Sequence, residues 1–106
     1  MQNHNEASIA YYSQMAEEYQ YSNITTSTTT IIKEGKGTLK SITINSLGTI
    51  ASLITVYDNT AASGTKIATI NSLTLSGTFL YDVKFTNGLT IVSTGTVAPN
   101  ITVAYK

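Results

Sequence analysis

From residue 23 onward the sequence alternates apolar and polar residues with a period of two, and turn-forming residues interrupt it at short intervals. This pattern is typical of short antiparallel strands that bury one face. It predicts about seven strands, at residues 24–32, 37–45, 52–58, 66–70, 78–85, 89–93 and 101–105. Strands of this length and spacing indicate an all-β domain over residues 23–106, either an antiparallel β-sandwich or a jelly-roll-like barrel.

The pair Asn87-Gly88 is the strongest turn signal in this domain. A two-residue type I′ turn needs positive φ at both central positions, and asparagine and glycine tolerate it. We therefore predict a β-hairpin that joins strands 78–85 and 89–93 as neighbours. Gly35 and Gly37 predict a second tight turn, and no helix follows them that could present its amides to a phosphate.

Residues 1–22 differ in composition and are predicted to form a separate N-terminal arm. Apolar side chains recur there at helical spacing, at Ile9, Tyr12, Met15, Ala16 and Tyr19. This spacing predicts an amphipathic helix over about residues 5–21. A helix of this length is marginal in water, so we expect it to be ordered when its apolar face is covered.

The arm is the candidate binding site of the chain, because tyrosine and methionine are enriched in interface cores. We expect Ile9, Tyr12, Met15 and Tyr19 to anchor the arm on another chain. The alternative is that this helix folds back and covers the sandwich of its own chain.

Composition favours self-association. One core within 106 residues is only marginally stable without further support. The chain has no cysteine for a disulfide, and its single histidine, His4, leaves no His/Cys set for zinc. A homo-oligomer, for example a trimer, is the remaining support.

The charge distribution argues against nucleic acid and membrane partners. The net charge is zero, and every positive charge is a lysine, so the chain lacks the arginine that binds phosphates and base edges bidentately. No segment approaches the roughly 20 apolar residues of a membrane span. Residues 1–24 carry three glutamates and no lysine, a net charge of −3, whereas residues 25–106 carry six lysines and three carboxylates, a net charge of +3. This division could steer the arm onto a neighbouring subunit or a basic shell, or it could reflect a solvated helix face.

The residue types in the chain give little support to a catalytic site. Without cysteine, and with its only histidine in a polar terminus, the chain offers no nucleophile with an activating base. The carboxylates Glu34, Asp58 and Asp82 stand at turns or on strand faces, where we interpret them as turn-forming or solvated groups rather than an acid pair. Asp58 and Asn59 lack the dense carboxylate loop of a calcium site. We therefore expect no enzyme, no cofactor and no metal.

Five segments together carry a resemblance to small virion proteins of tailed bacteriophages: GTLKSITIN (37–45), LITVYDNT (53–60), GTKIA (64–68), FLYDVKFTNGL (79–89) and ITVAY (101–105). The resemblance covers about residues 31–106 and leaves out the arm. It implies a capsid decoration or head-fibre component of the virion, assembled in the host cytoplasm as a symmetric oligomer. Its arm would bind the major capsid protein or another virion protein. The alternative is a tail-fibre adhesin or carbohydrate-binding module that contacts a host surface. No site residue is carried over, because the shared positions are structural.

Overall fold

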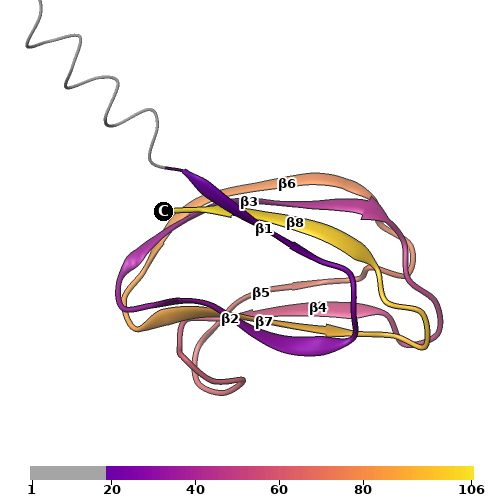
Figure 1. The fold of residues 1–106 in the computed structure, drawn as a ribbon, viewed down its shortest axis with the longest axis horizontal. Coiled ribbons are helices and arrows are strands. Elements are labelled where there is room, and N and C mark those ends of the chain that lie inside the picture. Colours follow the sequence, from indigo (N-terminus) through magenta and orange to yellow (C-terminus); the bar gives the residue numbers. More distant parts are fainter. Residues whose placement is uncertain (1–18) are drawn as a thin grey trace, which may run out of the picture.

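Two antiparallel sheets of four strands each pack face to face as a β-sandwich in the computed structural model, which describes residues 19–106 (Figure 1). The strands are β1 (Gln20–Ile24), β2 (Thr28–Glu34), β3 (Gly37–Ser46), β4 (Leu53–Tyr57), β5 (Lys66–Ile70), β6 (Gly77–Phe85), β7 (Gly88–Thr94) and β8 (Asn100–Tyr105). One sheet has the strand order β1-β8-β3-β6, and the other has the order β2-β7-β4-β5. The prediction of an all-β sandwich is confirmed, with eight strands instead of about seven.

The core lies between the two sheets and consists almost entirely of aliphatic side chains. Its buried members are Ile24, Leu39, Ile42, Ile44, Ile54, Val56, Ile70, Phe85, Leu89, Ile91, Ile101 and Val103. Each fully buried aliphatic side chain contributes roughly 1.5–3 kcal/mol relative to its exposed state. Strand β3 buries Leu39 and then Ile42, because a bulge at Lys40 shifts the register by one residue and returns the apolar face to the core.

The sheets are linked by chain crossings rather than by hairpins. Of the seven connections between strands, only the one from β4 to β5 joins neighbours in the same sheet. The hairpin predicted at Asn87-Gly88 is therefore wrong, because β6 and β7 belong to different sheets. Neither residue has a positive φ. Position 88 instead requires glycine because there is no room for a side chain: a Cβ there would lie 2.9 Å from the carbonyl oxygen of Asn59.

Two further predictions need correction near the start of the domain. The predicted strand 24–32 is two strands, β1 and β2, that lie in different sheets. Between them Ser27 donates a hydrogen bond to the carbonyl of Gly95 at 2.7 Å, which holds the crossing to the β7–β8 connection. The predicted helix also ends too late: Gln20 and Tyr21 belong to β1 and pair with β8. Its remaining part, residues 5–18, lies outside the described residues.

The antiparallel strands give the sandwich two chemically different ends. We call the end with the start of β1, the β2–β3, β4–β5 and β6–β7 connections and Lys106 the base, and the opposite end the tip. All nine charged side chains of the described residues lie in the half next to the base: Lys33, Glu34, Lys36, Lys40, Asp58, Lys66, Asp82, Lys84 and Lys106. The connections at the tip, residues 25–27, 47–52, 71–76 and 95–99, carry no charge.

Candidate functional site

Asp58, considered above as a catalytic or calcium-binding group, holds a connection between the sheets. Its Oδ1 accepts hydrogen bonds from the backbone amides of Asn87 at 2.8 Å, Thr86 at 3.0 Å and Gly88 at 3.4 Å. The bonds from Asn87 and Thr86 stabilise the carboxylate and lower the pKa of Asp58 below its usual value. The carboxylate at the end of β4 thus fixes the β6–β7 connection.

Asp82 forms an ion pair with Lys40, at 3.0 Å between Oδ1 and Nζ. Its φ of 52° lies in the left-handed region, which aspartate tolerates, and it sits where β6 inserts an extra residue opposite Lys40. The hydrogen bond and the charge of Asp82 raise the pKa of Lys40. Among residues 19–106, no group of three or more His, Cys, Asp or Glu side chains could hold a metal ion. The same residues include no helix long and apolar enough to cross a membrane.

At the base, the described chain begins with Tyr19, one of the four predicted anchors. Its ring centroid lies 4.8 Å from Nζ of Lys106 and 5.4 Å from Nζ of Lys40, within the range of cation–π attraction. Tyr19 remains 37% exposed. It therefore contacts the β domain of its own chain and fixes the place where the arm joins it. The other anchors, Ile9, Tyr12 and Met15, lie outside the described residues.

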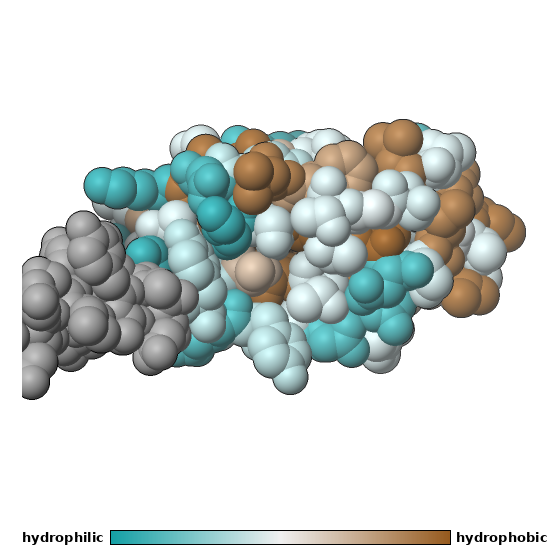
Figure 2. Space-filling model, turned by 90° about the horizontal axis from the view of Figure 1, so that it is seen from above, coloured by the Kyte–Doolittle hydropathy of each residue, from teal (hydrophilic) through white to brown (hydrophobic). Residues whose placement is uncertain are grey.

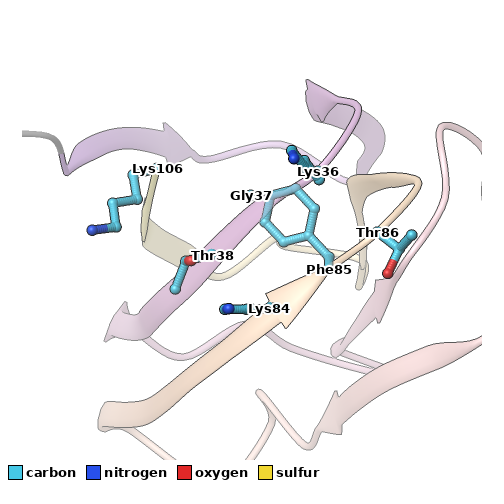
Figure 3. Close-up of a pocket in the computed structure, with 7 residues that line it drawn as sticks. All are labelled: Lys36, Gly37, Thr38, Lys84, Phe85, Thr86 and Lys106. Atoms are coloured by element: carbon cyan, nitrogen blue, oxygen red, sulfur yellow. The ribbon is translucent and has the colours of Figure 1, made fainter.

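An open groove of about 480 Å³ lies at the base, and Lys106, which contacts the ring of Tyr19, is one of the residues that line it (Figure 3). It is lined by Lys36, Gly37, Thr38, Lys84, Phe85, Thr86 and Lys106. A Cβ at Gly37 would lie 2.5 Å from Cζ of Phe85 and would also collide with the carbonyl oxygen of Lys106, so glycine is needed for this packing. Three lysine ammonium groups and no Asp or Glu side chain line the groove, which makes it attractive to acidic partners.

Hydrogen bonds tie three of the connections at the tip together. The amide of Gly48 donates to the carbonyl of Ser72 at 3.0 Å, and the amide of Thr49 donates to the carbonyl of Val97 at 2.9 Å. The hydroxyls of Ser52 and Ser72 share a buried hydrogen bond of 2.7 Å. The β3–β4, β5–β6 and β7–β8 connections therefore form one continuous surface.

That surface is apolar. Six side chains that are each 38–70% exposed lie on it, namely Leu47, Ile50, Leu53, Leu73, Leu75 and Val97. We call these six residues the apolar tip. In Figure 2, hydrophobic surface gathers at the right-hand end of the molecule, toward which β3 runs.

The serine pair under the apolar tip provides a test of how the connections are held. We expect Ser72→Ala to lower the free energy of unfolding by about 1–2 kcal/mol, because the hydroxyl of Ser52 stays buried without a partner. The double variant Ser52→Ala/Ser72→Ala should lose less than the sum of the two single variants, since it leaves no unpaired hydroxyl. Urea unfolding of all four proteins measures this coupling, and strictly additive losses would contradict it.

No family model, no curated protein and no solved structure matches this chain.

Sequence reasoning missed both the lysine-lined groove and the apolar tip. Lys36, Lys84 and Lys106 are far apart in the chain, and only the strand order brings them together. A signal for the tip was present, because residues 47–53 and 71–76 combine turn-like composition with leucine and isoleucine and lack any charge. Apolar residues in turns are the pattern that could have indicated an exposed contact surface.

Proposed function

We propose that this chain is a virion structural protein, a capsid decoration or head-fibre component of a bacteriophage particle. The observation that carries the proposal is the strand order. Eight antiparallel strands ordered β1-β8-β3-β6 and β2-β7-β4-β5, with six connections that cross between the sheets, have the arrangement of a jelly roll. Jelly rolls recur in viral capsid and lectin domains. Because a fold hosts many functions, the second support is the resemblance of residues 31–106 to phage virion proteins.

In this proposal the arm binds the shell and the β domain is displayed outward. Ile9, Tyr12 and Met15 bind the major capsid protein or another virion protein, and Tyr19 holds the root of the arm against Lys40 and Lys106. The arm has three glutamates and no lysine, whereas residues 25–106 have a positive net charge. No catalysis is included, because Asp58 and Asp82, two of the three carboxylates in residues 19–106, are engaged in backbone and ion-pair contacts.

The test is incorporation into particles. We expect the full chain with Ile9→Ser, Tyr12→Ser and Met15→Ser to be depleted at least about tenfold from purified particles, because truncating a few buried anchors removes most of a typical binding energy. Quantitative mass spectrometry of purified particles measures the copy number. The matched control Ser13→Ala/Gln14→Ala changes arm residues between the anchors and should incorporate normally. Absence of the unmodified protein from particles would overturn the virion proposal, and normal incorporation of the triple variant would overturn the anchoring role.

The alternative is a tail-fibre adhesin or carbohydrate-binding module, and the shared architecture of lectins is the observation that keeps it open. Among the described aromatic residues, Tyr21 is 75% exposed on β1, whereas Tyr57 is half-buried at the end of β4. A glycan array with the full chain separates the two proposals. Binding to a defined sugar that is lost in Tyr21→Ala or Tyr57→Ala would replace decoration by host-surface recognition.

A further inference from the structure

The backbone is strained at Ile50, which has the most exposed side chain of the apolar tip. Ile50 and Ala51 have φ values of 40° and 62°, in the left-handed region that is unfavourable for a β-branched residue. Hydrogen bonds hold this conformation: the carbonyl of Ile50 accepts from the amide of Thr96 at 3.2 Å, and that of Ala51 accepts from the hydroxyl of Thr94 at 2.8 Å. Asparagine or glycine would fit the same backbone with less strain.

Packing of the Ile50 side chain within its own chain does not offset this strain, because the side chain is 70% exposed. It lies among the five other residues of the apolar tip, which are 38–58% exposed, and clusters of exposed apolar side chains are a common mark of interaction sites. Strain retained at an exposed apolar position is typical of a binding surface.

The residue types at the tip restrict which class of partner can bind there. Its connections carry no lysine, arginine or aromatic residue, so they lack the groups that bind nucleic acid or anchor a protein at an anionic membrane surface. A second copy of the chain fits, since it presents the same uncharged surface and every described charge lies in the half next to the base. Contact between the tips of neighbouring copies buries no charge.

We propose that the apolar tip is the surface through which copies of this chain bind one another. This inference rests on the proposed function, in which the protein self-associates, and it names the surface that does so. Standard interfaces bury roughly 800 Å² on each partner. Because the apolar tip consists of six residues, whereas such interfaces use roughly 20–30 residues on each partner, we expect the association to be weak and to depend on protein concentration.

Sedimentation velocity of the full chain over a wide range of concentration tests the inference. Ile50→Asn should weaken self-association at least about tenfold. Its melting temperature at low protein concentration should be unchanged or a few degrees higher, because asparagine tolerates the left-handed backbone. Leu73→Ser is a second tip variant that does not touch the strained backbone and should also weaken association. The matched control is Leu80→Asn on β6, which removes a side chain that is 66% exposed and lies outside the tip.

The outcomes separate the two proposals. An unmodified chain that stays monomeric at every concentration would overturn the tip inference, and so would association that survives both Ile50→Asn and Leu73→Ser. A monomer that binds phosphatidylcholine vesicles, with binding lost in Ile50→Asn, would assign the tip to a membrane instead. Loss of association in both tip variants but not in Leu80→Asn supports the inference. Because particle incorporation is measured separately with the arm variants, a protein that associates through its tip yet is absent from particles would overturn the virion proposal alone.

Discussion

Asp58→Ala is expected to lower the free energy of unfolding by about 3 kcal/mol at neutral pH, since hydrogen bonds to a charged group contribute roughly 1.5–3 kcal/mol. Three consecutive amides, those of Thr86, Asn87 and Gly88, lose their acceptor in this variant. The connection that carries the chain from one sheet to the other then keeps its packing and the hydrogen bond from the amide of Gly35 to the carbonyl of Asn87 at 3.1 Å. Urea or thermal unfolding measures the loss, and a loss below about 1 kcal/mol would show that water replaces the carboxylate.

The same carboxylate sets a pH dependence. Because the folded state lowers the pKa of Asp58, its contribution is fully present above the pKa of about 3.8 expected for the unfolded chain and is lost as the pH falls through the lower folded value. We therefore expect the stability of the unmodified protein to decline below about pH 4 more steeply than that of Asp58→Asn. Asparagine is the matched control, because it has the same shape, keeps one oxygen acceptor and does not titrate in this pH range. Parallel acid profiles for the two proteins would contradict this role.

Gly88→Ala is the second change with a large expected effect, a loss of about 3 kcal/mol, at the upper end for overpacking. The new Cβ would lie 2.8 Å from Cγ2 of Thr60, 2.9 Å from the carbonyl oxygen of Asn59 and 3.0 Å from its carbon. Thr60 can rotate away, but the carbonyl of Asn59 is held by the hydroxyl of Thr90 at 2.7 Å. The backbone must therefore shift, and chemical denaturation measures its cost.

Gly35→Asn provides the contrast for this prediction. Gly35 has a φ of 80° and nothing within 4 Å of the position of a Cβ, so its requirement is conformational rather than steric. Asparagine tolerates the left-handed region, and we expect a loss below about 1 kcal/mol. Comparable losses for Gly35→Asn and Gly88→Ala would mean that close approach is not what selects glycine at position 88.

Local patterns placed most strands to within a residue at each end. The strand expected at 66–70 coincides with β5, and those at 37–45, 78–85 and 89–93 lie within a residue of β3, β6 and β7. Along β6 the side chains alternate between exposed and more buried positions, so the period of two is visible in the sequence, whereas β7 is buried at nearly every position and β3 is interrupted by its bulge. The β1–β2 break was missed because Thr25–Ser27 lies in a run of threonine and serine without glycine or proline to mark a turn.

Long-range contacts explain the remaining failures. Asn87-Gly88 has the composition of a hairpin turn, but Asp58, 29 residues before Asn87, binds the amides there and directs the chain into the other sheet. The bulge at Lys40 changes which side chains of β3 face the core, but no residue type at this position marks a bulge in the sequence. The lysine-lined groove also depends on which strands become neighbours. No local pattern encodes such pairings, since they are decided by packing across the sandwich.

The pairing of β1 with β8 determines when the domain can form during synthesis. Gln20 pairs with Tyr105, and β1 has no neighbour in its sheet other than β8. Strand β1 therefore cannot pair until β8 has left the ribosome. Only the β4–β5 hairpin offers a local start, and folds dominated by non-local pairing form on the millisecond to second timescale. Tyr19 joins the arm to β1, which pairs with the late-synthesised β8. The base beside Tyr19 therefore forms only after β8 has been synthesised.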